Sequence, residues 1–130
     1  METKNLEKIS ETKNYKVLAV KKEGCENLIV YQPSIDKIYS ENAQIFIDAF
    51  KAEKGDLIFD IGSINYMDSS GLASVLRGLN IQRNKQKHFG ICNATNKEVS
   101  AFFEITGLDK IFETWNLNLE EAIEDYKQKK

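Results

Sequence analysis

The sequence predicts an α/β domain with a mixed, mostly parallel sheet of about four or five strands and about four helices. Three observations predict this class: a β-hairpin pattern near the N-terminus, short apolar runs, and amphipathic helical segments that alternate with those runs. Strands that alternate with helices are joined by crossover connections and lie parallel. A chain of 130 residues has room for one such domain.

The start of the chain predicts an antiparallel edge to this sheet. Residues 1–14 are polar and charged, and we expect them to form a loosely held N-terminal arm. Residues 15–22 (YKVLAVKK) and 26–32 (ENLIVYQ) are apolar-rich and prone to β-structure, and a short turn with Gly24 separates them. Pro33 ends the second strand because it has no N–H to donate to a ladder.

The middle of the chain alternates between helix and strand. Apolar residues at helical spacing predict a helix that is capped by Ser40 and ends near Gly55. Residues 57–61 (LIFDI) form a nearly continuous apolar run, which is typical of a strand covered on both faces. A second amphipathic helix follows the loop at 62–70, and residues 89–92 (FGIC) predict the next strand.

The last third predicts two more helices. One spans residues 96–106 and stops at Gly107. Residues 111–115 then predict a last short strand or an extended segment, and a C-terminal helix follows. Two pairs of residues have the spacing of a capping box at the starts of these helices: Thr95 with Glu98, and Asn118 with Glu121.

Composition narrows the possible functions. Eighteen basic against 20 acidic residues give a net charge of −2, which predicts no nucleic-acid surface. The sequence has no apolar run of about 20 residues and no signal-peptide pattern, so we expect a cytoplasmic protein without direct membrane insertion. Cys25, Cys92 and the single His88 lack zinc-ligand spacing, so we expect no metal and no cofactor. The two cysteines allow one disulfide, for which the sequence gives no secretory context.

The loops at 31–39 and 62–70 follow strands, at the sheet edge where α/β folds tend to bind their ligands. The second loop leads into Asp68-Ser69-Ser70-Gly71. Asp68 is expected to cap the next helix by accepting from the amide of Ser70 or Gly71. Gly71 would let another backbone or a partner come close. By spacing alone, capping is sufficient to explain this turn.

Four segments together resemble a known family: 59–61 (FDI), 66–72 (YMDSSGL), 103–112 (FEITGLDKIF) and, more weakly, 34–36 (SID). They resemble the STAS-domain family and, within it, the bacterial anti-sigma factor antagonists. The resemblance spans about residues 15–126 and implies a single STAS domain at 15–130. Two positions depart from the family pattern: Pro33-Ser34, where a glycine usually precedes the acidic residue, and Ala73, where glycine is frequent.

The resemblance implies a function. In such antagonists a partner serine kinase, which is itself the anti-sigma factor, phosphorylates the first serine of the turn. The unphosphorylated antagonist binds the kinase and releases the sigma factor, and a PP2C-type phosphatase removes the phosphate. Carried over, Ser69 is the acceptor, and only the resemblance favours it over Ser70. The implied partner-binding residues are Asp36, Tyr66, Met67, Asp68, Ser69, Ser70 and Gly71.

Three other interpretations stay open at this point. An enzyme is disfavoured because Ser69 lacks the G-x-S-x-G context and a serine triad would depend on His88 alone. A STAS scaffold without phosphorylation, in a stress-signalling or transport complex, would make Ser69 only a helix cap. For Tyr66 and Met67, core packing and a partner interface are equally supported. We expect a monomer or a weak homodimer that pairs through an exposed edge strand.

Overall fold

The computed structural model describes residues 5–112 and 114–129. Its main sheet has the strand order β1-β2-β3-β5-β7. The first two pairings are antiparallel and the next two are parallel. A second, two-stranded parallel sheet is formed by β4 and β6. The strands are β1 (Leu6–Glu11), β2 (Tyr15–Val20), β3 (Leu28–Pro33), β4 (Lys37–Ile38), β5 (Asp56–Asp60), β6 (Tyr66–Met67) and β7 (Phe89–Cys92).

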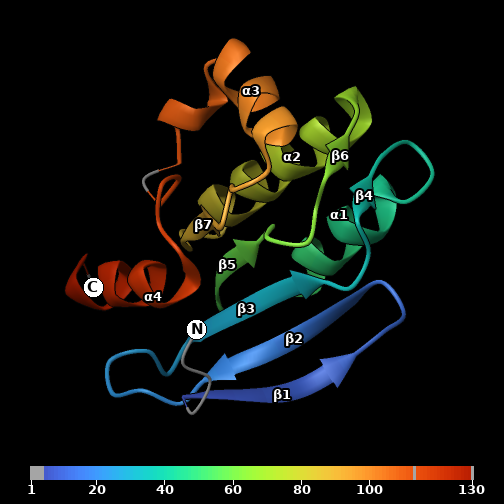
Figure 1. The fold of residues 1–130 in the computed structure, drawn as a ribbon. Coiled ribbons are helices and arrows are strands. Elements are labelled where there is room, and N and C mark those ends of the chain that lie inside the picture. Colours follow the sequence, from blue (N-terminus) through green and yellow to red (C-terminus); the bar gives the residue numbers. More distant parts are fainter. Residues whose placement is uncertain (1–4, 113, 130) are drawn as a thin grey trace.

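Helices cover both faces of the main sheet, as Figure 1 shows. On one face lie α1 (Ala43–Ala52) and α2 (Ser69–Asn84), and on the other lies α4 (Leu119–Lys129). At one end of the α1–α2 layer stands α3 (Lys97–Ile105), followed by a 3₁₀ turn at Leu108–Lys110. The predicted α/β class is confirmed: the described residues form four α-helices and a mixed sheet that begins with antiparallel strands.

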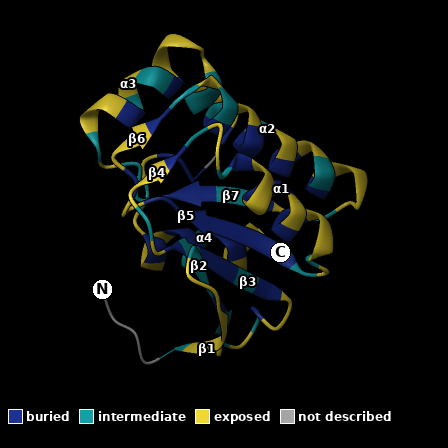
Figure 2. Ribbon diagram, turned by 90° about the vertical axis from the view of Figure 1, so that its right-hand side faces the viewer, coloured by how far each residue is buried: buried dark blue, intermediate teal, exposed yellow. Residues whose placement is uncertain are grey.

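The sheet divides the hydrophobic core into two parts, and Figure 2 shows its central strands buried between the helices. Aromatic rings dominate the part beneath α1 and α2. Phe50 and Phe59 are fully buried there, with ring centroids 5.2 Å apart in an edge-on arrangement. Burying each such side chain stabilises the fold by about 1.5–3 kcal/mol. On the other face, α4 presents Leu119 and Ala122 to the apolar side chains of β2, β3 and β5.

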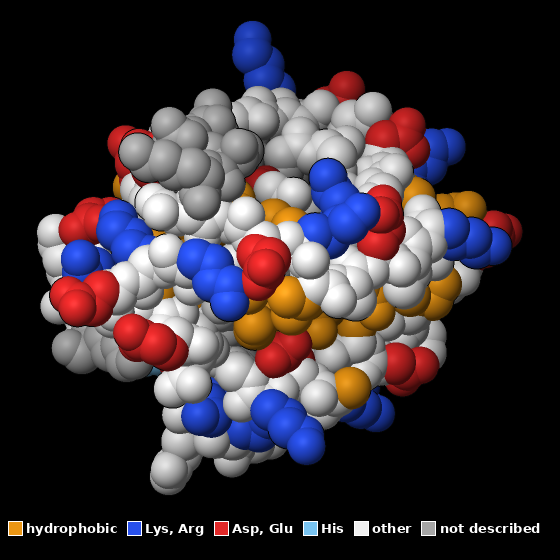
Figure 3. Space-filling model, turned by 90° about the horizontal axis from the view of Figure 1, so that it is seen from below, with side chains coloured by type: hydrophobic (Ala, Val, Ile, Leu, Met, Phe, Trp, Pro, Cys, Tyr) orange, Lys and Arg blue, Asp and Glu red, His pale blue; other side chains and the backbone are white. Residues whose placement is uncertain are grey.

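The segment that was expected to be a loosely held N-terminal arm contains a strand. Residues 6–11 form β1, which pairs with β2 and has a register shift between Lys8 and Ser10. The segment is polar because β1 is an edge strand, and only Leu6 packs against the core beneath α4. Figure 3 views the molecule from below, the side on which β1 lies, and shows hydrophobic side chains among charges of both signs. Ile9 of β1 is 53% exposed.

Two predicted helix caps are wrong by one or two positions. Asn42 and not Ser40 precedes α1, and the Asn42 side chain accepts from the Tyr39 N–H at 2.9 Å instead of capping the helix. Asn96 and not Thr95 caps α3, because its Oδ1 accepts from the N–H groups of both Glu98 and Val99 at 3.0 Å.

Other helix ends lie as predicted. Asn118 and Glu121 form a reciprocal capping box, with each backbone N–H donating to the side chain of the other, at 2.9 and 2.8 Å. Gly107 follows α3 in the left-handed conformation, with φ of 75°.

The strand or extended segment expected at 111–115 is not seen among its described residues, and residue 113 lies outside them. Ile111 ends the 3₁₀ turn, and the Trp115 N–H donates to the Phe112 carbonyl oxygen at 3.1 Å. The chain turns here because Phe112 and Trp115 both pack against the ring of Phe103. Within 5–112 and 114–129, no helix is both long and apolar enough to cross a membrane.

Candidate functional site

The two loops singled out in the sequence meet at the carboxyl ends of β3 and β5. Their short strands β4 and β6 pair in parallel, with Ile38 opposite Met67. The Ser63 hydroxyl lies 3.0 Å from the Pro33 carbonyl oxygen and 2.9 Å from that of Ile35. The Asp36 carbonyl oxygen accepts from the Asn65 N–H at 2.8 Å. These bonds hold the loop that carries Asp36 against the loop that leads to α2.

Asp68 is the N-cap of α2 and uses both carboxylate oxygens. Its Oδ1 accepts from the Gly71 N–H at 2.9 Å, as a capping residue does. Its Oδ2 accepts from the Ser40 N–H at 3.1 Å, which comes from the other loop. The predicted cap through Gly71 is confirmed, whereas the bond to Ser40 has no signal in the sequence because it joins residues far apart in the chain.

Ser69 is the first residue of α2 and is exposed, whereas Ser70 is half-buried. The first backbone N–H groups of a helix lack intrahelical partners and form the positive end of its dipole. Asp68 engages the N–H of Gly71. A group attached to the Ser69 hydroxyl would therefore lie at a helix end that favours negative charge, close to the Asp68 carboxylate.

Gly71 is buried and brings α2 into contact with β4 and β6. A Cβ atom at this position would overlap the Ile38 carbonyl oxygen and would stand 2.6 Å from the Met67 side chain. Glycine thus permits a close approach between backbones within the chain.

Exposure differs among the seven residues expected to bind a partner. Asp36, Tyr66 and Ser69 are exposed, and Asp68 and Ser70 are half-buried. Tyr66 is 48% exposed, whereas Met67 is 7% exposed and belongs to the core beneath α1 and α2. Of the two interpretations left open for this pair, packing describes Met67, and Tyr66 presents its ring to the solvent.

The flank that α3 adds to this surface was not predicted from the sequence. A shallow hollow of about 170 Å³ lies between β6 and the start of α3, with Tyr66, Glu98 and Phe102 among the residues that line it. Ile105, on the same helix, is 84% exposed. Its place within the predicted helix was visible in the sequence, but its exposure depends on how α3 packs.

A buried polar cluster lies behind the loops. Asp60, at the end of β5, accepts from Gln32 at 2.9 Å and from the side chain of Asn93 and the backbone N–H of Gly62 at 3.0 Å. These bonds satisfy a carboxylate that is only 8% exposed.

Burial, with a smaller effect of Asp60, raises the pKa of the Cys92 thiol. Cys25 and Cys92 are both buried, and neither is part of a disulfide bond.

Other polar features lie away from this site. His88 precedes β7 at the opposite end of the sheet, where its backbone N–H donates to Asp56 at 2.9 Å.

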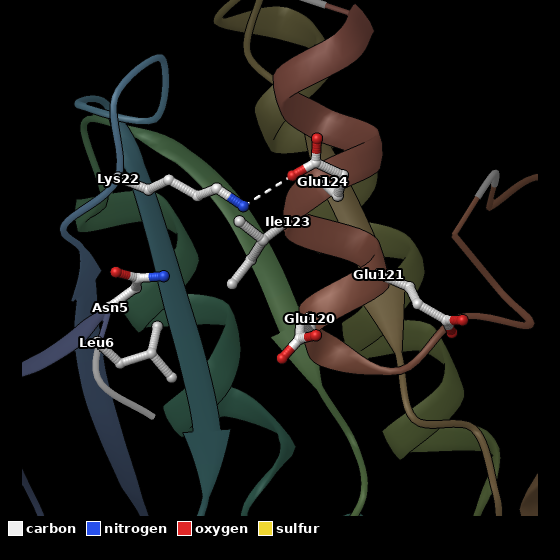
Figure 4. Close-up of a pocket in the computed structure, with 7 residues that line it drawn as sticks. All are labelled: Asn5, Leu6, Lys22, Glu120, Glu121, Ile123 and Glu124. Carbon is white, nitrogen blue, oxygen red and sulfur yellow. Dashed lines mark hydrogen bonds and ion pairs between the residues drawn. The ribbon is translucent and has the colours of Figure 1, made fainter. Parts of the chain in front are cut away.

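The groove in Figure 4, of about 410 Å³, lies between the start of β1 and α4 and is spanned by the 2.7 Å ion pair of Lys22 and Glu124. That ion pair lowers the pKa of the Glu124 carboxyl. Within the described part of the chain, no three His, Cys, Asp or Glu side chains gather as metal ligands do.

Known proteins share both the sequence pattern and the fold. A family model described as the STAS domain matches residues 17–124. The structure is similar to an anti-sigma-factor antagonist (STAS) domain protein from Planctomyces limnophilus, with a TM-score of 0.71 and 15% identity over 89% of this chain and 99% of that one. It is also similar to a candidate anti-sigma factor antagonist from Thermotoga maritima, with a TM-score of 0.68 and 18% identity over 78% of this chain and 89% of that one. No curated protein is significantly similar in sequence.

Proposed function

Because this chain belongs to the STAS domain family, we propose that it is a phosphorylation-controlled protein-binding switch of the anti-sigma factor antagonist type. The unphosphorylated chain binds a serine kinase that is also an anti-sigma factor, and binding frees the sigma factor. Phosphorylation of Ser69 ends that complex, and a PP2C-type phosphatase restores it. The proposed setting is the cytoplasm of a bacterium, with transcription as the output.

One observation carries the proposal: Ser69 is exposed at the first position of α2, beside a carboxylate that is already held in place. Asp68 is fixed by its bonds to Gly71 and Ser40. A phosphate on Ser69 would add about −1.5 to −2 charges next to it. The free amides of α2 tolerate that charge, so the fold is kept. A partner surface that fits the unphosphorylated serine would clash with the phosphate and would meet electrostatic repulsion, so binding ends.

The proposed reaction needs only the kinase and ATP. The Ser69 hydroxyl oxygen attacks the γ-phosphorus, the bond between that phosphorus and the β,γ-bridging oxygen breaks, and ADP leaves. The hydroxyl proton passes to a base of the kinase. This chain contributes the acceptor and its position, and we propose no catalytic residue within it. The phosphatase later hydrolyses the ester with water and releases phosphate.

The proposed partner surface combines the exposed residues on both loops with the flank of α3. Asp36 directly precedes β4, and Tyr66 is the first residue of β6. The pairing of these two strands therefore places the two residues side by side. Phe102 and Ile105 extend the apolar part of that surface. Such a surface, with aromatic and aliphatic groups beside a charge, is of the kind that protein partners bury.

The first test is phosphopeptide mass spectrometry on the protein recovered from its own cells, with site resolution between Ser69 and Ser70. Phosphate at Ser69, and its loss in Ser69→Ala, is the expected result. Ser70→Ala serves as the matched control and keeps the phosphate. If no phosphate is found under growth or stress, and no co-encoded serine kinase modifies the purified chain, the proposal fails and a constitutive STAS scaffold is favoured.

A further inference from the structure

The outer edge of β1 is an exposed strand edge of the main sheet. β1 is the first strand in the order of that sheet, and among the described residues only β2 pairs with it. Residues 7–11 are all exposed, and Figure 3 views the molecule from the side on which this strand lies. Ile9 is 53% exposed and belongs to neither part of the hydrophobic core. Backbone groups on such an edge can pair with a strand of another chain.

The hydrogen bonds to β2 identify the backbone groups of β1 that face outward. The Lys21 N–H donates to the Asn5 carbonyl oxygen at 2.6 Å, and the Thr12 N–H donates to that of Tyr15 at 2.8 Å. In an antiparallel ladder, alternate residues direct both their N–H and their C=O group to the partner strand. Counted from these two bonds, the residues whose groups face away from β2 are Leu6, Lys8 and Glu11.

A register shift gives this edge an irregular spacing. The shift lies between Lys8 and Ser10, where β1 has one residue more than β2, and the extra residue is Ile9. The outward groups of Lys8 and Glu11 are therefore three residues apart, whereas those of a regular strand are two apart. A regular strand matches only one of these positions at a time. A second copy of β1 that runs antiparallel has the same spacing and matches both.

Charge complementarity selects how two such strands pair. Lys8 opposes Leu18 of β2 and Glu11 opposes Lys16, so the side chains of Lys8 and Glu11 lie on one face of the sheet. Within β1 they form an exposed ion pair of 2.6 Å. In the arrangement that aligns the two irregular spacings, Lys8 of each copy stands opposite Glu11 of the other. Arrangements that set Lys8 opposite Lys8, or Glu7 opposite Glu7, bring like charges together and are unfavourable.

We propose that two copies of this chain associate through β1, antiparallel to each other, with Lys8 of each copy opposite Glu11 of the other, so that the two main sheets join into one. Main-chain hydrogen bonds supply the affinity, and the charge pairs fix the register. Ile9 of each copy lies beside the two-fold axis and loses exposed apolar surface. The dimer is weak because one strand pair buries less surface than a stable interface does. Ser69, at the start of α2, is outside this interface.

Sedimentation equilibrium of the unphosphorylated full chain tests the association. We expect a dimer fraction that rises with concentration. Lys8→Glu puts two pairs of like charges into the interface and should weaken association about tenfold or more. Lys51→Glu changes the net charge equally at an exposed position on α1 and should leave association unchanged. A chain that stays monomeric at about 1 mM, or a dimer that Lys8→Glu does not weaken, overturns the proposal.

An exchange of charges tests the register. Glu11→Lys alone should also weaken association, because two lysines then face each other. An equal mixture of the Lys8→Glu chain and the Glu11→Lys chain should form mixed dimers, since each charge again faces its opposite. The chain with both substitutions should associate as the parent does. If neither the mixture nor the double variant recovers association, the proposed register is wrong.

Amide hydrogen exchange reports the strand pairing itself. The amides of Lys8 and Glu11 face outward and should be protected in concentrated samples and lose that protection on dilution. The amides of Glu7 and Ser10 face β2 and should stay protected at both concentrations. A dimer in which Lys8 and Glu11 exchange freely would contradict pairing through β1. No kinase is present in these measurements and Ser69→Ala should behave as the parent, so failure here is distinct from failure of the proposed switch.

Discussion

The Ser40 N–H donates to Oδ2 of Asp68 at 3.1 Å, and this bond links the loop before α1 to the first turn of α2. The other oxygen of the same carboxylate caps α2 through Gly71. One side chain thus fixes both the direction of the helix that begins at Ser69 and the loop beside it.

Replacing Asp68 by alanine should lower the free energy of unfolding by about 0.5–2 kcal/mol, the usual cost of losing an N-cap. Asp68→Asn keeps one acceptor oxygen and should cost less. Urea denaturation measures both variants, and amide exchange at Ser40 reports the link between the loops. If Asp68→Ala leaves exchange at Ser40 unchanged, the link does not hold in solution.

Negative charge at Ser69 should change binding but not the fold. Ser69→Asp places a carboxylate at the exposed start of α2, where the helix dipole offers about 0.3–1 kcal/mol of stabilisation at low salt. We expect unchanged or slightly raised stability, and loss of affinity for the partner kinase by calorimetric titration. Asn80→Asp adds the same charge at an exposed position within α2 and should keep the affinity. Full affinity in Ser69→Asp would contradict the electrostatic part of the switch.

Gly71→Ala should destabilise the chain by about 1–3 kcal/mol, the usual cost of forcing extra volume into packed structure. The added methyl group meets the Ile38 carbonyl oxygen and the Met67 side chain, so α2 must move away from β4. Thermal unfolding gives the loss of stability, and NMR shifts of Ile38 and Met67 show where it arises. Ala73→Ser, at an exposed position on the same turn, is the control and should cost less than about 0.5 kcal/mol.

Tyr126→Phe should destabilise the chain by about 1–3 kcal/mol, because it leaves the buried Asp56 carboxylate without the hydroxyl that donates to it at 2.5 Å. Tyr39→Phe removes an exposed bond to Glu41 and should cost little.

The same tyrosine predicts a dependence on alkaline pH. Burial, and then the bond to Asp56, raise the pKa of Tyr126 above its ordinary value of 10.0. The folded state therefore holds the proton more tightly than the unfolded state. Its contribution is complete below about pH 10 and is lost as the pH rises toward the folded pKa. The stability difference between the parent chain and Tyr126→Phe should shrink above pH 10, and a constant difference would contradict this.

Local patterns in the sequence predicted most of the fold because they report local physics. The apolar run at 57–61 and the capping box of Asn118 with Glu121 both depend on residues close in the chain, and both formed as predicted. The strand at 6–11 was missed because an edge strand needs few apolar side chains. Ser40 was misassigned as a cap because Asn42, two residues on, precedes the helix.

The sequence by itself determined the family, the class of fold and the Asp68 cap at the start of α2, because each is written in residues that are neighbours or share a period. Tertiary structure alone decided which of the candidate residues reach the surface. Met67 and Tyr66 are adjacent in the sequence, yet the pleat of β6 turns one into the core and the other toward solvent. The bond from Ser40 to Asp68 likewise exists only once distant segments have packed, since a hydrogen bond between two loops depends on their position in space.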